Sequence, residues 1–371
     1  MNIGIVIPGF SSDENDWAIP VQLNLAREQA KQTNYRVIAL RYPHRRDQYA
    51  IFGAQVYSLG YGAWTRGLKR LELWRESFRL LETLHREEPF DVLHAMWADE
   101  CGMIAGMFGR KHHIPVVVSI MGGELARLPA IGYGGGLTRY GRWITREALK
   151  RADRVHVVSG YVDRLLDMAG VAVEKRTRIP LGVDAERFRP SGMAYEPGRL
   201  ICAASLIPVK NHALLLNALV HLPDVTLDLV GDGTDRRKLE QLAAELHIAD
   251  RVQLRGAQPH TAMPALLESA ALHILTSYHE TFALSIAEAA AVGVPSISTN
   301  VGMLPDYPSL GAVAEAHDPA KLAMIIDAAL RDVDVLNALR RSARATVERE
   351  LTIEKTAAAL RMLYAELLDA Q

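Results

Sequence analysis

Short apolar runs rich in β-branched residues alternate along the chain with longer segments of helical periodicity. In the first half, strands are expected at Ile3–Ile7, Tyr35–Leu40, Asp91–Ala95, Pro115–Ile120 and Arg154–Val158, with helices at Val21–Gln32, Thr65–Arg86 and Arg142–Arg151. In the second half, strands are expected at Leu200–Ser205, Thr226–Val230, Arg251–Arg255, Leu272–Thr276 and Ser296–Ser298. The helices expected there are His212–Leu222, Asp235–Leu246, Pro264–Ser269 and Phe282–Val292, and a last helix is expected at Ile353–Asp369. This alternation is typical of parallel sheets covered by helices on both faces.

Both halves of the chain repeat this pattern, and 371 residues are more than one domain usually holds. We therefore expect an α/β protein with two doubly wound parallel-sheet domains, at residues 1–186 and 187–352. The stretch RFRPSGMAYEPGR (187–199) is rich in Pro, Gly and charge and is the predicted linker. Residues 353–371 are expected to form a helix that packs back toward the first domain.

Composition and charge narrow the class of protein. The formal net charge of -1 gives no reason to expect nucleic-acid binding. Only two cysteines are present, far apart and in apolar stretches, which fits a reducing cytoplasm. The N-terminal run MNIGIVIPG has no basic start and has the length of a strand, so we interpret it as the first strand and not as a signal peptide. No uncharged apolar run approaches the length of a membrane span. A cytoplasmic protein is expected, and attachment to the inner face of the membrane stays open. The sequence indicates no oligomeric state.

In open parallel sheets, ligands bind beyond the carboxyl ends of the strands, so residues that follow strands are the candidates for a site. The segment HETFALSIAE (279–288) follows the strand ALHILTS and places Glu280 in a loop. Thr281 is expected to cap a helix whose first backbone N–H groups belong to Phe282, Ala283 and Leu284. Such free N–H groups form a ready anion site, especially for phosphate. Glu288 lies about two turns into the same helix among alanines, where sugar hydroxyls would be suitable donors. The alternative is that both acids simply face solvent.

Three further strand ends carry candidate residues. Lys210 lies in the loop LIPVKNH, just before a helix that Asn211 would cap, where a cation is unfavourable unless a diphosphate binds. A solvated loop lysine is the alternative. In VGDGTDRRKLE (230–240), Gly231 and Gly233 would let the backbone approach a ligand, although the G-x-G-x-x-G fingerprint is absent. NVGMLPD (300–306) indicates only a loop by itself.

Taken together, these segments carry a resemblance to a known family. The segments are FDVLHA (90–95), MGGEL (121–125), RADRVHVVS (151–159), IPLGVDAERFRP (179–190), LIPVKNHALLLNAL (206–219), LVGDGTDRRKLEQL (229–242), HETFALSIAEAAAVGVP (279–295) and NVGMLPD. With them the chain resembles the retaining, glycosyltransferase family 4-like enzymes of GT-B architecture, in which two Rossmann-like domains face each other across a ligand cleft. The match is nearly continuous in the second half and patchy in the first.

The resemblance implies a transfer of sugar from a nucleotide-diphosphate donor to a hydroxyl acceptor, with retention of configuration. It gives Glu280 and Lys210, together with Glu124, the catalytic roles, and Glu288 the ribose hydroxyls. The residues implied in donor binding are Glu288, Thr281, Phe282, Ala283, Leu284, Ser205, Gly231, Gly233 and Arg255. No metal or cofactor is implied, and a UDP- or GDP-sugar is the expected donor.

The chain departs from the family pattern at three places. Ser205 stands where the family usually has an arginine for the diphosphate, and Arg236 or Arg255 is a candidate replacement. Met121 stands where the family commonly has a histidine, and its thioether has no acid–base function. Pro8-Gly9-Phe10-Ser11-Ser12 replaces the usual paired glycines after the first strand. The residues expected to line the acceptor cleft in the first domain are Gly9, Phe10, His94, Met121, Gly122 and Gly123, with Glu124.

Two basic and aromatic stretches, at 61–86 with Trp64 and Trp74 and at 133–151, suggest weak peripheral contact with a membrane and an acceptor linked to lipid. Acidic residues in the first stretch balance much of its charge, so a solvated helix is the alternative. Two other functions stay open from the sequence. One is a nucleotide-sugar epimerase or phosphorylase on the same architecture, and the other is a nucleotide-sugar-binding protein without transferase activity.

Overall fold

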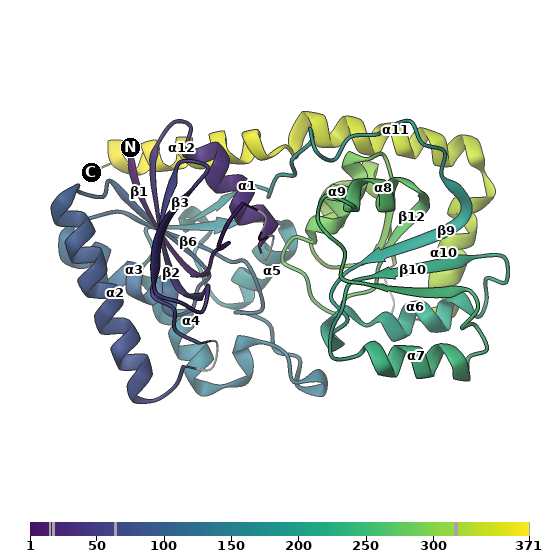
Figure 1. Cartoon of the computed structure of the whole chain (residues 1–371), viewed down its shortest axis with the longest axis horizontal. Coiled ribbons are helices and arrows are strands. Elements are labelled where there is room, and N and C mark those ends of the chain that lie inside the picture. Colours follow the sequence, from purple (N-terminus) through teal and green to yellow (C-terminus); the bar gives the residue numbers. More distant parts are fainter. Residues whose placement is uncertain (15, 17–18, 63–64, 315–317, 371) are drawn as a thin grey trace. The chain divides into compact units, whose positions relative to one another are not determined.

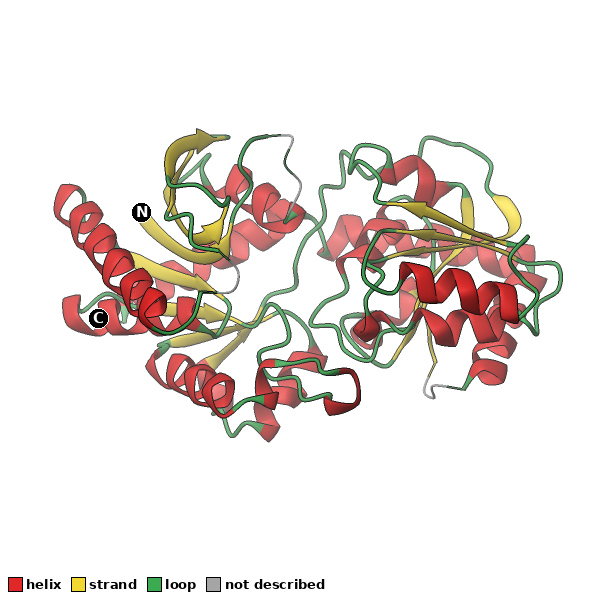
Figure 2. Cartoon of the chain, turned by 60° about the horizontal axis from the view of Figure 1, so that its bottom comes forward, coloured by secondary structure: helices red, strands yellow, loops and turns green. Residues whose placement is uncertain are grey.

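The structure is a computed structural model that describes every residue except 15, 17–18, 63–64, 315–317 and 371. It consists of two compact units (Figure 1). Unit 1 comprises residues 1–181 together with 353–371, and unit 2 comprises residues 182–352. The chain thus first changes unit between residues 181 and 182, a few residues before the boundary expected from the sequence. Both units have helices on the faces of a largely parallel sheet (Figure 2).

Unit 1 is built on an eight-stranded sheet with the order β3-β4-β2-β1-β5-β6-β7-β8. Its strands are β1 (Asn2–Gly9), β2 (Asn34–Tyr42), β3 (Asp47–Ile51), β4 (Ala54–Ser58), β5 (Val92–Met96), β6 (Val116–Ser119), β7 (Arg154–Val157) and β8 (Arg176–Arg178). All neighbours pair in parallel except β3 and β4, which form an antiparallel hairpin at one edge. This hairpin adds to the strands expected from the sequence. The central strands are buried on both faces, which explains their nearly continuous Val and Ile content.

Six helices accompany this sheet among the described residues. They are α1 (Pro20–Gln29), α2 (Leu68–Glu87), α3 (Glu100–His112), α4 (Arg139–Arg151), α5 (Gly160–Met168) and α12 (Ile353–Asp369). The last helix packs beside α1, and both contribute to one core with β1 and β2 (Figure 1). Leu360, Leu363 and Tyr364 of α12 are at most 2% exposed in that core. Residues from the two ends of the sequence therefore complete a single hydrophobic core.

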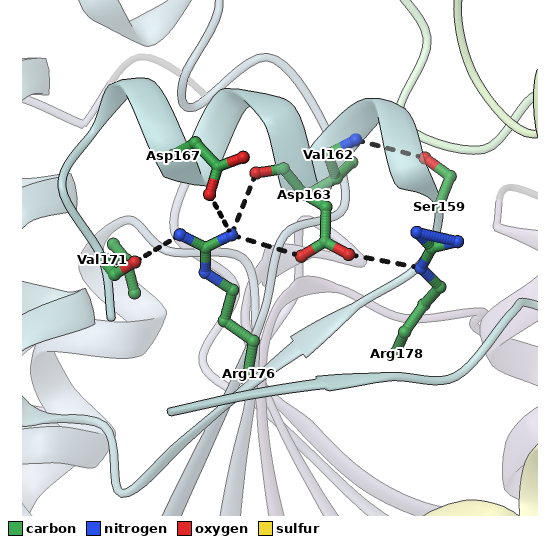
Figure 3. A network of polar contacts seen from close by, with 7 residues as sticks. All are labelled: Ser159, Val162, Asp163, Asp167, Val171, Arg176 and Arg178. Carbon is green, nitrogen blue, oxygen red and sulfur yellow. Dashed lines mark hydrogen bonds and ion pairs between the residues drawn. The ribbon is translucent and has the colours of Figure 1, made fainter. Parts of the chain in front are cut away.

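The edge strand β8 is tied to α5 by ion pairs (Figure 3). Arg176 Nη1 lies 2.7 Å from Asp167 Oδ1 and 3.4 Å from Asp163 Oδ1, and its other nitrogen donates to the carbonyl of Val171. Arg178 Nε contacts the second oxygen of Asp163 at 3.2 Å. At the start of α5, the Ser159 hydroxyl accepts from Val162 N at 3.3 Å, an N-cap bond. These contacts fix the edge strand β8 against α5.

Unit 2 has a six-stranded parallel sheet with the order β11-β10-β9-β12-β13-β14. Its strands are β9 (Glu196–Ala203), β10 (Thr226–Val230), β11 (Val252–Gly256), β12 (Ala270–Leu275), β13 (Ser296–Thr299) and β14 (Gly311–Ala314). Its helices are α6 (His212–Leu219), α7 (Arg236–Glu245), α8 (Met263–Glu268), α9 (Leu284–Ala291), α10 (Pro319–Arg331) and α11 (Val333–Glu350). Helices α6, α7 and α10 pack in one row, and α8, α9 and α11 form a second group (Figure 1). One large hydrophobic core cluster of unit 2 runs from Leu200 to Leu336 and consists of residues of that unit.

Candidate functional site

The strand order of unit 2 reverses beside β9. From β9 the chain proceeds to β10 and β11 on one side, and β12 returns to the other side. Ligands of doubly wound folds bind at such a switch point, beyond the carboxyl ends of the two strands involved. The loops that follow β9 and β12 are joined here, since Tyr278 N donates to Val209 O at 2.8 Å and Thr276 Oγ1 donates to Lys210 O at 3.1 Å. This junction positions the candidate site residues.

Lys210 and Glu280 meet at the switch point. Lys210 Nζ lies 2.5 Å from Glu280 Oε1, and the Ser277 hydroxyl donates to the same oxygen at 2.6 Å. The two charged side chains are 21% and 12% exposed, so the pair is largely withdrawn from solvent while keeping a route to it. If an anion binds beside this pair, the ammonium of Lys210 can contact the anion as well as the carboxylate of Glu280. Sequence and structure therefore agree that these two loops share one location.

The N-terminus of α9 lies directly after Glu280. The first helical turn is closed by Ile286 N donating to Ala283 O at 3.0 Å, so the N–H groups of Phe282, Ala283 and Leu284 have no carbonyl of α9 to bind. Two expectations need correction: the helix begins at Leu284, not at Phe282, and its N-cap is Ala283 rather than Thr281, with no side-chain cap. Ala283 has the left-handed φ of 71°, which turns the chain into the helix so that an upstream threonine is not at the capping position.

Glu288 lies just over one turn into α9 and is 8% exposed. Its Oε1 lies 3.1 Å from His260 Nε2, and the other ring nitrogen of His260 lies 3.1 Å from Arg187 Nη1. The His260 ring also packs edge-on against Phe188, with 5.1 Å between ring centroids. Neither His260 nor Arg187 was singled out from the sequence: Arg187 lies among other charged residues in DAERFRP (184–190), and His260 lies in an irregular segment. The available signal for His260 is its place shortly after the end of β11.

The glycines after β10 have a different role from the one expected. A Cβ atom on Gly231 would lie 2.1 Å from Ala204 O, and one on Gly233 would lie 2.3 Å from Leu206 O. Both glycines therefore allow close approach of the loop after β9, whose Leu206 N donates to Asp232 O at 2.9 Å. They support the loop that carries Lys210, and the backbone they approach is the protein's own.

The two arginines considered as replacements for the cation missing at Ser205 both have acidic partners. Arg255 Nε lies 2.7 Å from Asp228 Oδ1, and Arg236 Nε lies 3.1 Å from Glu240 Oε1. Arg255 shares Asp228 with Arg199, whose Nη2 lies 2.6 Å from Asp228 Oδ2, so one carboxylate faces two guanidinium groups. Ser205 itself is exposed near the start of the loop that follows β9.

In unit 1, Glu124 holds two loops together beyond β5 and β6. Its carboxylate accepts hydrogen bonds from the backbone N–H groups of Gly122 at 2.7 Å, Met121 at 3.1 Å and Ala98 at 3.2 Å. The side chain is buried, and this burial raises the pKa of Glu124 to about 7, while the N–H donors favour its ionised form. Glu124 thus fixes the loop that contains Met121, Gly122 and Gly123, the last of which packs beside the Tyr133 ring.

His94 and Phe10 do not line an open surface of unit 1, which corrects their assignment to a cleft. Phe10 is 2% exposed in the core that contains α12. Gly9, beside it, is the last residue of β1, and a Cβ atom there would lie 2.8 Å from the Tyr42 side chain. The imidazole of His94 is fully buried, because it belongs to the middle of β5 and not to the loop that follows.

A chain of buried hydrogen bonds occupies His94. Tyr364 Oη lies 2.7 Å from His94 Nδ1, Ser119 Oγ lies 2.7 Å from both His94 Nε2 and His156 Nδ1, and His156 Nε2 lies 2.8 Å from Ile179 O. Burial lowers the pKa of His94 well below its usual value and that of His156 to about 4, so both rings are neutral. Since a carbonyl only accepts, His156 Nε2 carries its proton, and every bond then follows one direction from Tyr364 to Ile179. This chain links α12 to three central strands.

Among the described residues, no group of three or more His, Cys, Asp or Glu side chains is placed to hold a metal ion. The same part of the chain contains no helix that is both long enough and apolar enough to cross a bilayer.

Comparison with protein families gives two adjoining matches. Residues 19–182 match the family described as "Glycosyl transferase 4-like domain", and residues 184–346 match "Glycosyl transferases group 1". Among similar characterised proteins, D-inositol 3-phosphate glycosyltransferase 1 of Catenulispora acidiphila is 28% identical over 68% of this chain and 67% of its own length. Glycogen synthase of Mycobacterium tuberculosis is 27% identical over 70% of this chain and 64% of its own length.

Solved structures share the fold over its full length. Sucrose-phosphate synthase from Thermosynechococcus elongatus superposes with a TM-score of 0.82 at 19% identity, covering 100% of both chains. Anabaena HepE in complex with UDP-glucose superposes with a TM-score of 0.75 at 18% identity, covering 99% of this chain and 100% of its own. Both family descriptions are of glycosyl transferases, and the two relatives are a glycosyltransferase and a synthase, so the comparisons do not favour the interpretations as a binding protein, an epimerase or a phosphorylase.

Proposed function

Because this chain belongs to the GT-B glycosyltransferases, we propose that it transfers a sugar from a nucleotide-diphosphate donor to a hydroxyl acceptor with retention of configuration and without a metal ion. The observation that carries the proposal for the donor site is the pairing of Lys210 with Glu280 at the switch point of unit 2, directly before the N-terminus of α9. That arrangement offers a cation, a carboxylate and free backbone N–H groups within one short segment.

The roles follow from the charges. The diphosphate would bind the N–H groups of Phe282, Ala283 and Leu284, where the helix dipole also favours negative charge. Lys210 would turn from Glu280 toward the diphosphate and stabilise the charge that develops as the sugar leaves. Glu280, released from part of this ion pair, would accept hydrogen bonds from hydroxyls of the donor sugar. Glu288 would accept hydrogen bonds from the ribose of the nucleotide.

The donor proposed is a UDP- or GDP-sugar, and calorimetric titration with UDP-, GDP-, ADP- and dTDP-glucose and with GDP-mannose tests it. One of these donors should bind and raise the thermal unfolding temperature, since a ligand specific for the native state stabilises it. Product analysis by NMR should then show the anomeric configuration of the donor retained, with activity unchanged by EDTA. Absence of binding by every nucleotide sugar would contradict the proposal, and an inverted product would contradict its mechanism.

We place the acceptor on unit 1 and propose that it is linked to lipid, with weak contact between unit 1 and an anionic membrane. Exposed apolar side chains gather at the starts of α2 and α4: Leu68 is 83% exposed, Leu71 58% and Trp143 46%. The two helix starts adjoin, because the Arg70 guanidinium lies 4.3 Å from the centre of the Tyr140 ring. We call Leu68, Leu71, Tyr140 and Trp143 the α2–α4 patch.

Cations flank the α2–α4 patch, with Lys69 and Arg139 both exposed beside its apolar residues. Aromatic and aliphatic groups beside such cations suit the interface of an anionic leaflet, and cytoplasmic leaflets carry such lipid. Trp64, which also suggested this contact, lies outside the described residues, and the indole of Trp74 is only partly exposed.

Sedimentation with phosphatidylglycerol vesicles tests the membrane contact. The chain should bind these vesicles more than phosphatidylcholine vesicles, and a Leu68→Ser/Trp143→Ser variant should bind several-fold less. Met324→Ser is a matched control, because Met324 is 71% exposed in unit 2. Equal sedimentation of the wild type with both kinds of vesicle would contradict the proposal.

A further inference from the structure

His260 connects Glu288 to a cation on a different segment of unit 2. It lies between β11 and α8 and is 9% exposed, and its imidazole is held on three sides. Nε2 lies 3.1 Å from Glu288 Oε1, Nδ1 lies 3.1 Å from Arg187 Nη1, and the Phe188 ring packs edge-on against it. Arg187 is positioned in turn by its own backbone, because Arg187 N donates to Asp184 Oδ1 at 3.0 Å. The imidazole therefore has little freedom to rotate.

The arginine decides which ring nitrogen of His260 carries the proton. A guanidinium has only donors, so the nitrogen that faces Arg187 must accept and must be unprotonated. A neutral imidazole has one proton, and it then resides on Nε2, the nitrogen that faces Glu288. The N–H bond of His260 is thus directed at Oε1 of the carboxylate, and the opposite tautomer would place two donors against each other at Arg187 and two acceptors at Glu288.

This arrangement makes the two oxygens of Glu288 different. Oε1 accepts from His260, whereas Oε2 has no hydrogen-bond partner among the described residues. A carboxylate held by one oxygen keeps a fixed plane, so the other oxygen has a defined direction. A ribose offers two neighbouring hydroxyl donors, and such donors bind best to an acceptor that is already oriented.

We propose that His260 is a positioning residue that orients Glu288 toward the ribose hydroxyls, with its tautomer set by Arg187, and that this makes the donor site selective for ribonucleotides over 2′-deoxyribonucleotides. This proposal rests on the proposed function of Glu288 as the ribose ligand. His260 touches neither sugar nor phosphate in this arrangement and acts through the carboxylate.

The test compares nucleotides that differ in one hydroxyl. UDP and 2′-deoxy-UDP, and GDP and 2′-deoxy-GDP, are titrated calorimetrically into the full chain. The wild type should bind the better ribonucleotide about tenfold more tightly than its deoxy form, because one hydrogen bond to a charged group is worth about that factor. His260→Phe keeps a ring against Phe188 but removes both nitrogens. It should reduce the ratio of the two affinities to about two or less, because only the binding of the ribonucleotide is weakened.

Two more variants separate positioning from general damage. His260→Gln can still donate to Glu288 and accept from Arg187, so it should restore at least half of the wild-type preference. Arg187→Met removes the group that fixes the tautomer and should give a preference between those of the wild type and His260→Phe. His221→Phe, a change at an exposed histidine of the same unit, should leave the preference unchanged.

The outcomes distinguish this inference from the proposed function. If the wild type binds none of the four nucleotides, the proposed function fails and the inference fails with it. If the wild type binds but His260→Phe weakens the ribonucleotide and deoxyribonucleotide forms equally, or leaves the preference intact, only the inference is overturned. Should His260→Phe fail to fold, as judged by circular dichroism, the ratios measured for His260→Gln and Arg187→Met decide the question.

Discussion

Glu280 and Glu288 are two acids in one of the most apolar segments of the chain, and each is compensated in a different way. Glu280 has an ammonium and a hydroxyl on one oxygen, while Glu288 has an imidazole N–H. A buried carboxylate with a purely structural role is expected to have a full set of hydrogen-bond donors. Among the described residues, neither Glu280 nor Glu288 has such a set. Both acids therefore retain the capacity to accept hydrogen bonds from a ligand.

Replacing Lys210 by methionine should lower turnover by about 100-fold or more, since it removes a cation aimed at the leaving diphosphate. The side chain keeps its approximate length, so folding should be preserved. Lys238→Met is the matched control, because Lys238 is an exposed lysine of unit 2 whose ion pair is with the neighbouring Asp235. Steady-state assays with the donor identified by calorimetry measure both variants. Wild-type turnover in Lys210→Met would remove the main support for the donor site.

The neutral histidines of unit 1 predict a loss of stability in acid. Their folded pKa values lie below the usual 6.5, that of His156 at about 4. As pH falls below about 6.5, these rings take up protons in the unfolded chain but not in the folded chain. The free energy of unfolding therefore decreases by up to about 1.4 kcal/mol per pH unit for each ring. Glu124, whose pKa is raised to about 7, has the opposite effect between about pH 7 and pH 4.5 and offsets one of the two rings. The free energy of unfolding should therefore be level above pH 7 and show a net fall between about pH 6.5 and pH 4, which denaturant unfolding monitored by amide exchange in β5, β6 and β7 can measure.

A double variant tests that the buried rings cause this loss. His94→Gln/His156→Gln should be less stable than the wild type at pH 7, because the buried hydrogen-bond chain is broken. Its free energy of unfolding should nevertheless decrease less than that of the wild type between pH 7 and pH 5. His221→Gln, at an exposed position, should follow the wild type. An identical pH dependence in all three proteins would refute the explanation.

At the scale of elements, the helix α12 contributes one face to the core of unit 1. Leu363 is 2% exposed and Met362, its neighbour in sequence, is 65% exposed. Leu363→Ala should therefore destabilise unit 1 by about 2–5 kcal/mol, whereas Met362→Ala should stay within about 0.5 kcal/mol of the wild type. Thermal and denaturant unfolding compare the two. Equal effects of both substitutions would mean that α12 is not docked as described.

The alternation of strands and helices could be predicted because the hydrophobic period of a strand differs strongly from that of a helix. The predicted strand ends then located Lys210 and Glu280. The start of α9 was predicted incorrectly. Threonine is a good capping residue, but the chain turns into the helix two residues later, through a left-handed alanine whose conformation is not encoded by local preference. His94 was placed at a strand end because its strand was expected to stop one residue too early, whereas β5 continues to Met96. His260 and Arg187 become neighbours only in the folded unit, 73 residues apart, where no periodicity could connect them.

At the scale of the molecule, the proposed donor ligands all belong to unit 2, which is continuous in sequence and has its own core. Residues 182–352 expressed alone should therefore fold and bind the same nucleoside diphosphate as the full chain, within about tenfold in affinity, a difference of about 1.4 kcal/mol. Calorimetry and circular dichroism test this. A folded fragment without any nucleotide affinity would show that the donor site needs residues of unit 1.

Unit 1 is different, because its core includes helix α12 from residues 353–369 as well as strands from the beginning of the chain. On the ribosome, the sheet of unit 1 emerges first, but the helix that covers it emerges only after all of unit 2 has been made. At 5–20 residues per second, that interval lasts roughly 10 to 35 seconds. During this time the apolar face beside α1 has no covering helix, so newly made chains should depend on chaperones that hold this face until translation ends.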